Sequence, residues 1–159
     1  MPYMMQMRQR SHTYHCLKEE NMFIMKKEEV ISEISKINSY LRKCLWMDFA
    51  LCQSHFGKLE LYGAIDQTYN NYVDNYEIKI EFEQPHFVSS LFSWQIDTSK
   101  PFIQLVSEEE ESALNTKYRV EQGNYIFIIN AEDFESPPIF IAAKRITCKI
   151  LNENPFPKG

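Results

Sequence analysis

The chain has 159 residues, of which 44% are hydrophobic and 14% aromatic, and its formal net charge is −5 at pH 7. A chain of this length and apolar content can bury the core of one domain, and its composition is not that of a disordered protein. No stretch approaches the roughly 18–20 apolar residues that a membrane-spanning helix requires, so we expect no membrane association.

The charge is unevenly distributed along the chain. Residues 1–56 hold eight Lys and Arg against six Asp and Glu, a net of +2, whereas residues 57–159 hold nine against sixteen, a net of −7. Because nucleic-acid binding depends on clustered Lys and Arg, the acidic second part disfavours a nucleic acid as the partner. It favours a basic protein through complementary electrostatic potentials.

The first 24 residues differ from the rest of the chain. They are rich in Met, Gln, Arg and His, show no hydrophobic periodicity, and lack the continuous apolar core of a secretory signal. Met22 and Met25 stand directly before a helical pattern. We therefore expect residues 1–24 to be a disordered arm or an extension from an upstream start site, and residues 25–159 to form a single domain.

A helical pattern begins at residue 26. In its early part the apolar residues recur at the spacing of one helix face. The apolar residues of the whole segment are Val30, Ile34, Ile37, Leu41, Cys44, Leu45, Met47, Phe49 and Leu51. We expect one long helical segment over residues 26–52, straight or bent near residues 43–46, with Gly57 as its stop. Past Leu45 the segment is apolar on nearly all sides, so its last turns are expected to be buried.

After Gly57 the hydrophobic period changes to that of a strand. We expect strands at residues 58–65, 76–83, 102–106, 117–120, 125–129 and 139–151, with one or two more within 86–97. Short links between neighbouring strands favour antiparallel pairing. The sequence thus predicts an α+β fold, in which a long N-terminal helical segment packs on a mainly antiparallel, curved sheet or sandwich of about six to eight strands.

The link from Asp66 to Asn75 is longer than the roughly two to five residues that a hairpin needs. Tyr69 and Tyr72 lie in it among small polar residues, a composition typical of recognition loops, and Asp66 and Asp74 flank them. We take these four residues as candidates for binding a partner. The alternative is that both tyrosines fold back over the edge of the sheet.

Glu108, Glu109, Glu110 and Glu111 form the densest block of charge. Such runs are often solvated loops or the first turn of a helix, where negative charge is favourable, and EEEESALNTKY is compatible with one or two helical turns. The functional interpretation is an electrostatic surface for a basic partner.

The sequence offers little support for catalysis or metal binding. Cys52 and His55 would share a face at the C-terminal end of the expected helix, where the dipole raises a thiol pKa, so a core thiol and a capping histidine are the simpler interpretation. His12, His15 and Cys16 lie in the N-terminal segment and do not make a closed tetrahedral site. We expect no cofactor and no metal, and the four cysteines, without a C-x-x-C pair, indicate reduced thiols in a cytoplasmic protein.

The aromatic residues leave a second function class open. An apolar pocket inside the sheet, for a small ligand or a substrate, would have a supply of aromatic side chains. They are Phe82, Phe87, Phe92, Trp94, Phe127 and Phe140. The same residues would serve equally as ordinary core. A third possibility is an assembly subunit that pairs an exposed sheet edge with another copy of itself.

The order of elements resembles one bacterial class. A helix, the turn SHFGKLELYG, an antiparallel strand pair with a long link, and the final pair YIFIINAED and PPIFIAAKRITCKIL are similar to the small α+β immunity proteins encoded beside polymorphic toxins. In this chain the turn reads Ser54-His55-Phe56-Gly57 and lacks the Asp of the Phe-His-Asp-Ala type. The resemblance implies a protein that binds a basic toxin domain without chemistry of its own.

Overall fold

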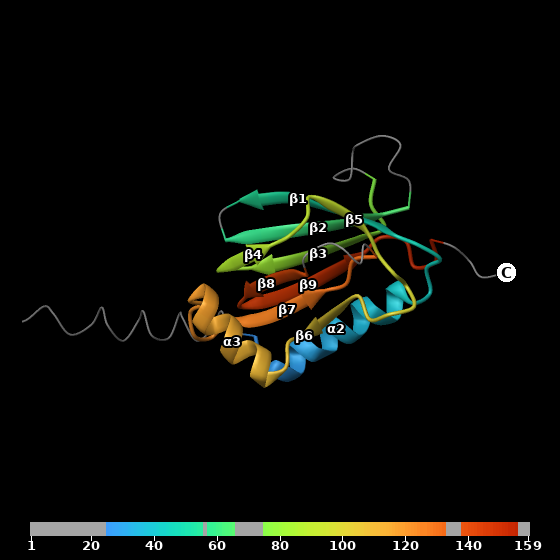
Figure 1. Ribbon diagram of the computed structural model, residues 1–159. Coiled ribbons are helices and arrows are strands. Elements are labelled where there is room, and N and C mark those ends of the chain that lie inside the picture. The colour runs from blue at the N-terminus through green and yellow to red at the C-terminus, as the bar shows by residue number, and fades with distance from the viewer. Residues whose placement is uncertain (1–24, 56, 66–74, 133–137, 156–159) are drawn as a thin grey trace, which may run out of the picture.

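The computed structural model describes residues 25–55, 57–65, 75–132 and 138–155 of the chain. Within them it contains two helices and nine strands (Figure 1). The helices are α2 (Lys27–Leu41) and α3 (Glu108–Tyr118). The strands are β1 (Asp48–His55), β2 (Lys58–Ala64), β3 (Ile78–Glu83), β4 (Phe87–Ser89), β5 (Ser93–Gln95), β6 (Ile103–Leu105), β7 (Tyr125–Ile129), β8 (Ile139–Ala143) and β9 (Arg145–Ile150).

The strands form two antiparallel sheets that share a corner. The five-stranded sheet has the order β5-β1-β2-β3-β9 and the four-stranded sheet the order β4-β8-β7-β6. The chain crosses between the sheets after β3, β4, β5 and β8, and the crossings from β3 to β4 and from β8 to β9 lie together at the corner. At this corner the N–H of His86 donates to the carbonyl of Ala142 at 2.8 Å, and the N–H of Lys144 donates to that of Glu83 at 3.2 Å. Gln84, with φ of 49°, and Pro85 make the bend.

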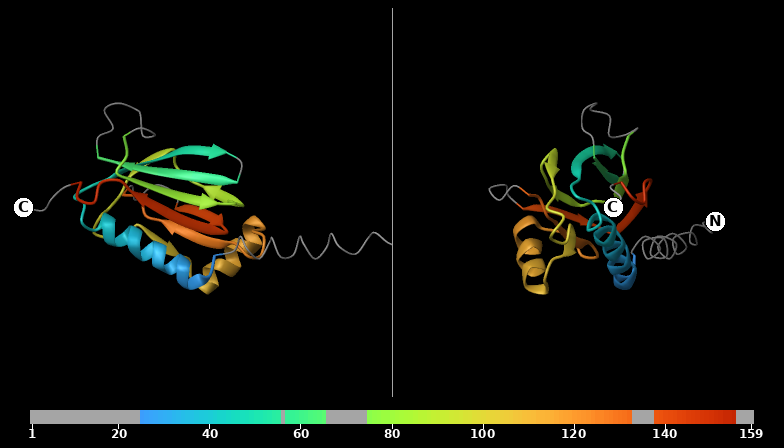
Figure 2. Two further views of the ribbon diagram at one scale, coloured as in Figure 1. Left: turned by 180° about the vertical axis from the view of Figure 1, so that it is seen from behind. Right: turned by 90° about the vertical axis from the view of Figure 1, so that its right-hand side faces the viewer.

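Helix α2 closes the gap between the two sheets, and it does so with polar side chains as well as apolar ones. On one side the N–H of Cys148 in β9 donates to Glu33 at 3.1 Å, and Lys36 donates to the Cys148 carbonyl at 3.3 Å. On the other side the Asn38 amide bonds both the N–H and the carbonyl of Ile103 in β6, at 3.0 and 2.9 Å. The helix runs beside β9 and β6 (Figures 1 and 2). Its side chains therefore satisfy backbone groups on the outer edges of these two strands.

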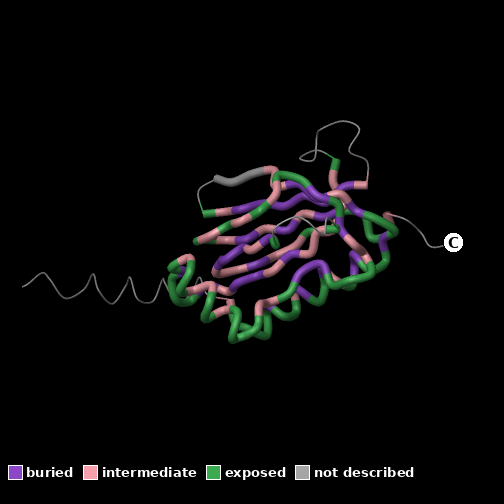
Figure 3. The backbone as a smooth tube through the Cα atoms, in the orientation of Figure 1, coloured by how far each residue is buried: buried purple, intermediate pink, exposed green. Residues whose placement is uncertain are grey.

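One main core fills the space enclosed by the two sheets and α2. Its largest fully buried side chains include Phe49, Phe82, Phe102 and Phe127, and α2 contributes Val30, Ile34 and Ile37. The helix face and the alternating strands predicted from the sequence supply these residues. An apolar repeat of about 3.6 residues in a helix, or of two residues in a strand, places the apolar side chains on one face, and that face is turned toward the core. Figure 3 shows this buried interior along the strands.

Helix α3 covers the outer face of the four-stranded sheet. There Val120, Ile126 and Ala142 form a second, smaller cluster, against which Leu114 and Tyr118 of α3 pack. This second layer explains why residues 125–129 are apolar on both faces, as expected for an internal strand. Neither helix in the described part of the chain is long and apolar enough to cross a membrane.

The expected long helical segment is wrong beyond Leu41. Helix α2 ends there, and Asp48–His55 is strand β1, paired with β2 and β5. Met47 and Phe49 are buried two residues apart, which is the period of a strand, whereas Leu45 and Trp46 lie in the turn and are exposed. The apolar residues past Leu41 thus belong to a strand and not to the last turns of a helix.

Three further expectations need correction. Residues 117–120 are not a strand, because Lys117 and Tyr118 end α3 and Arg119 takes the left-handed conformation that follows it. The expected strand at 139–151 is two strands in different sheets, divided at Lys144. The described residues contain nine strands and not six to eight, because β1 stands where the end of a helix was expected and the C-terminal segment is divided, which outweighs the loss of the strand at 117–120.

Candidate functional site

Four of the candidate binding residues, Asp66, Tyr69, Tyr72 and Asp74, lie outside the described residues. The strand ends from which their link departs are described. The N–H of Ile65, directly after β2, donates to the Glu77 carboxylate at 2.9 Å. The N–H of Glu77, in turn, donates to the carbonyl of Gly63 at 2.9 Å. The two strands are thus held together up to the residues where the link begins and ends.

The acidic block Glu108–Glu111 forms the first turn of α3, which confirms the interpretation of this block as the start of a helix. Ser107 caps this helix, since its hydroxyl accepts from the N–H of Glu110 at 3.3 Å while its own N–H donates to the Glu110 carboxylate at 3.3 Å. Glu108 and Glu109 are exposed. Helix α3 lies at the end of the sheets away from the last residues of β2 and the first of β3 (Figure 1), so the structure does not bring this acidic turn to those strand ends.

Cys52 lies on β1, so the expectation that it ends a helix is wrong. It occupies an irregular position where the β1–β2 register shifts between Leu51 and Gln53. Burial, and then the nearby Glu60 carboxylate, raise the pKa of the Cys52 thiol to about 11. The thiol is therefore protonated at neutral pH and is not an activated nucleophile.

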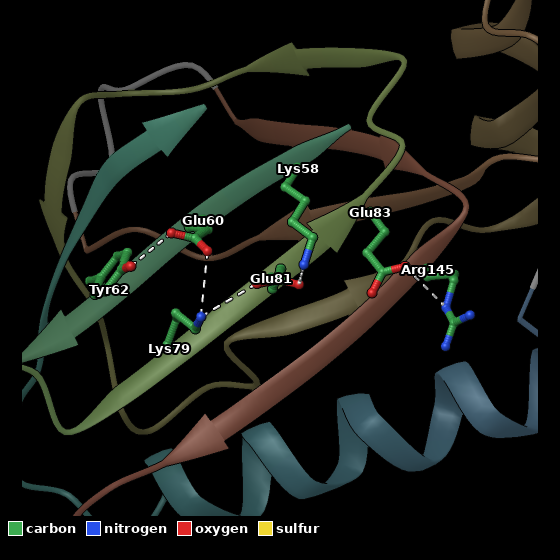
Figure 4. A network of polar contacts seen from close by, with 7 residues as sticks. All are labelled: Lys58, Glu60, Tyr62, Lys79, Glu81, Glu83 and Arg145. Carbon is green, nitrogen blue, oxygen red and sulfur yellow. Dashed lines mark hydrogen bonds and ion pairs between the residues drawn. The ribbon is translucent and has the colours of Figure 1, made fainter. Parts of the chain in front are cut away.

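The outer face of the five-stranded sheet carries a network of paired charges (Figure 4). Lys58 reaches Glu81 at 2.6 Å, and Lys79 lies 3.4 Å from both Glu81 and Glu60. The hydroxyl of Tyr62 donates to the second oxygen of Glu60 at 2.7 Å. Alternation places these side chains on one face, because their neighbours along β2 and β3 point into the core.

The pairing shifts the pKa values of several groups in this network, including Glu81 and Lys79. Partial burial would raise the pKa of Glu81, but hydrogen bonds and charge from Lys58 and Lys79 outweigh it, and the pKa is lowered. Burial would lower the pKa of Lys79, but Glu60 and Glu81 outweigh it, and the pKa is raised. The charged side chains of β2 and β3 in this network are therefore paired with one another across the two strands.

The described residues contain no cluster of three or more His, Cys, Asp or Glu side chains that could hold a metal ion. Among the aromatic candidates for a pocket, Phe82 packs edge-on to Phe127 with ring centroids 5.2 Å apart. Phe87 stacks on Tyr118 at 4.4 Å, in the cluster under α3 that Phe140 also joins. These four side chains are used in packing between elements.

An apolar surface that the sequence analysis missed lies at one end of the molecule. Leu45 is 60% exposed, Trp46 40% and Leu151 51%. The indole N–H of Trp46 donates to the carbonyl of Ile65 at 3.4 Å. The Leu151 N–H donates at 2.7 Å to the carbonyl of Glu77, whose carboxylate holds Ile65. We call Leu45, Trp46 and Leu151 the apolar end.

The apolar end lies where the link of residues 66–74 leaves β2 and enters β3. It is assembled from the turn after α2 and the residue after β9, which are more than a hundred positions apart in the chain. One signal for it was present in the sequence. The period-2 spacing of Met47, Phe49 and Leu51 ends the helix before Leu45 and leaves Leu45 and Trp46 in an exposed turn.

Comparison with known proteins adds no relative, since no family model, no curated protein and no solved structure matches the chain.

Proposed function

We propose that the chain is a non-catalytic protein-binding module whose recognition surface is the apolar end. The observation that carries the proposal is the exposure of Leu45, Trp46 and Leu151 on one end of an otherwise well-packed domain. Exposed large apolar side chains that gather in one place are typical of interaction surfaces. Tryptophan is enriched among the residues that dominate binding energy.

The proposed surface extends to the neighbouring link. Tyr69 and Tyr72 belong to the segment that begins and ends beside the apolar end, and Asp66 and Asp74 would add negative charge there. Tyrosines and small polar residues around an apolar centre are a common composition for recognition. Electrostatic attraction of a basic partner is supported by the net charge of −7 on residues 57–159.

The particular role proposed is that of an immunity-type protein, which would bind and block a basic toxin domain in the same cytoplasm. Binding of this kind needs no catalytic group in the inhibitor. The closed charge network on the five-stranded sheet is compatible with that, because it holds its acids and bases in structural pairs. The acidic turn of α3 would act in this role by steering the partner from a distance.

The first test is affinity capture from native lysate at low salt with the full chain. A Trp46→Ser, Leu151→Ser double variant and a Tyr69→Ala, Tyr72→Ala double variant are compared with Ile31→Ser, a control that alters an exposed apolar side chain on α2. We expect one basic protein, retained by the wild type and the control and lost with both double variants. Equal retention by all four proteins would contradict the proposal.

The retained protein is then purified and expressed alone and together with the chain. The immunity role requires that it arrest growth when alone and that co-expression restore growth. The Kd should rise steeply with salt, since the attraction is partly electrostatic. A Kd that stays constant from low to high salt would exclude the acidic contribution, and a partner that is harmless alone would exclude the immunity role while leaving the binding function intact.

A small-ligand site is the second candidate, favoured by one observation. The indole N–H of Trp94 is buried and has no hydrogen-bond acceptor among the described residues. A buried donor without an acceptor is costly, and a ligand atom could supply one. If a small polar ligand binds there, titration should change the fluorescence of Trp94, and Trp46→Phe should leave that change intact.

A further inference from the structure

The edges of both sheets are protected against pairing with other chains, with one exception. The outer side of β9 is covered by α2 through Glu33 and Lys36, and that of β6 by Asn38. The two other edge strands, β4 and β5, have only three residues each. Covering an edge and keeping it short are the usual ways in which proteins avoid unwanted strand addition.

The exception is the second half of β1. Strand β5 pairs only with Asp48, Phe49 and Ala50, and the N–H of Leu51 donates to the carbonyl of Phe92 at 2.9 Å. Beyond that point no described residue pairs with the outer side of β1, over Cys52–His55. In Figures 1 and 2 this half of β1 runs along the rim of the five-stranded sheet. Residues 51–55 contain no Lys, Arg, Asp, Glu or Pro, and His55 is counted as neutral at pH 7, so the sequence places no barrier there.

We propose that two copies of this chain pair their β1 strands at this edge, antiparallel and about a two-fold axis, to form a symmetric dimer. An isologous contact requires a surface that is complementary to itself. An antiparallel strand of uncharged residues meets this condition, because each copy offers the same backbone groups in reverse order and no like charges are opposed. The same absence of charge makes the edge a poor match for a strongly basic segment, which is why we assign it to a second copy.

The length of the open edge agrees with this geometry. In each copy β5 blocks the edge up to Leu51, and β1 ends in the turn at Gly57. Reversing one strand against the other therefore brings Phe92 of each copy to the last residues of β1 in the second copy. Phe92 is 86% exposed, the most exposed large apolar side chain in the described chain.

Such a contact is small. Stable interfaces bury roughly 1,200–2,000 Å², and one short strand pair with an aromatic anchor at each end lies near the lower limit. The association should therefore depend on concentration, with a dissociation constant in the micromolar to millimolar range. This inference is independent of the proposed function, because it uses a different surface.

Sedimentation velocity of the full chain over a concentration series tests the proposal, together with hydrogen exchange at the lowest and highest concentrations. We expect a monomer–dimer equilibrium and slower exchange of the amides of Cys52–His55 at high concentration. Phe92→Lys should raise the dimer Kd by about tenfold or more, since it replaces the aromatic anchor at each end of the contact with a charged side chain that must be desolvated. Phe92 is exposed, so the variant should fold, which circular dichroism checks.

Ile31→Lys is the matched control, because it places the same charge on another exposed apolar position, on α2, and it should dimerise as the wild type does. A protein that stays monomeric into the millimolar range overturns the proposal. So does a dimer that Phe92→Lys leaves unchanged, or one whose protected amides lie elsewhere, for example at the apolar end.

Discussion

At the scale of single residues, Gly63 in β2 is a position where the backbone leaves no room for a side chain. A Cβ at this position would lie 2.7 Å from Ile78 Cγ2 and 2.7 Å from Phe49 Cζ. Both neighbours are fully buried, and Phe49 is also stacked on Phe102 at 4.4 Å, so neither can move without disturbing the core. The absence of a side chain at Gly63 is what lets β1 and β3 bring these two residues over β2.

We therefore expect Gly63→Ala to lower the free energy of unfolding by about 1–3 kcal/mol, the usual cost of overpacking a core. Urea denaturation followed by circular dichroism measures it. Gly57→Asn is the contrasting variant, because Gly57 has a φ of 75° and open space, and Asn tolerates that conformation. It should cost much less than Gly63→Ala, and equal losses would show that the close approach at Gly63 is not limiting.

The charge network predicts how stability responds to acid. The pKa of Glu81 is lowered in the folded protein, so its contribution to stability is fully present above the unfolded-state value of about 4.3 and is lost as the pH falls through the folded-state value. Glu81→Gln should destabilise the protein by about 1–3 kcal/mol at pH 7, because Lys58 loses its charged partner and Lys79 loses one of its two.

The measurement is the free energy of unfolding of wild type and Glu81→Gln at pH 7 and at successive values below pH 4. The difference between the two proteins should shrink as the pH falls, because the wild-type carboxylate is then protonated and resembles the amide. A difference that stays constant with pH would mean that shape and hydrogen bonding at this position matter and its charge does not.

At the scale of elements, side chains of α2 form hydrogen bonds with the edge strands β6 and β9 where a further strand would otherwise pair. The Asn38 side chain makes with Ile103 both hydrogen bonds that a neighbouring strand would make, at 2.9 and 3.0 Å. Asn38→Leu keeps the size but removes both bonds from a partly buried edge, so we expect a loss of about 1–3 kcal/mol. Ser39→Ala, on the exposed side of the same turn, should cause no loss. Hydrogen exchange at Ile103 should accelerate in the first variant alone.

Some elements could be predicted from the sequence because their patterns are local. The helical spacing of Val30, Ile34 and Ile37 and the alternation of Ile78, Ile80 and Phe82 each specify a face, and the structure confirms both. The end of α2 was missed because Leu45 and Trp46 continue an apolar run. Their exposure depends on β1 starting at Asp48, which is fixed by pairing with residues far along the chain.

The break between β8 and β9 has a different cause. The segment from Ile139 to Ile150 reads as one strand, since nothing in its own sequence interrupts it. The bend is imposed by the strand opposite, where Gln84 and Pro85 turn β3 into β4 and Lys144 must follow. The hydrophobic pattern of one strand does not show where the neighbouring strand of the sheet bends. The apolar end could not be predicted for the same reason. Trp46 and Leu151 are far apart in the sequence, and only the folded chain brings them to one end of the molecule.

At the scale of the whole molecule, the two proposed surfaces lie at opposite ends of the five-stranded sheet. The apolar end adjoins the start of β1, where Trp46 precedes Asp48, whereas the open edge is the last part of the same strand. Since β1 is eight residues long and extended at roughly 3.3 Å per residue, the surfaces are separated by a distance that excludes direct contact. Partner binding and dimerisation should therefore be independent.

This independence is a prediction with two matched variants. Trp46→Ser should weaken binding of the captured partner at least about tenfold and leave the dimer Kd unchanged, whereas Phe92→Lys should do the reverse. Isothermal titration of each variant with the partner, beside sedimentation of each variant alone, separates the two effects. The contrary result is that Phe92→Lys weakens binding of the captured partner as well. The open edge of β1 would then belong to the recognition surface, and the second strand at that edge would come from the partner and not from another copy.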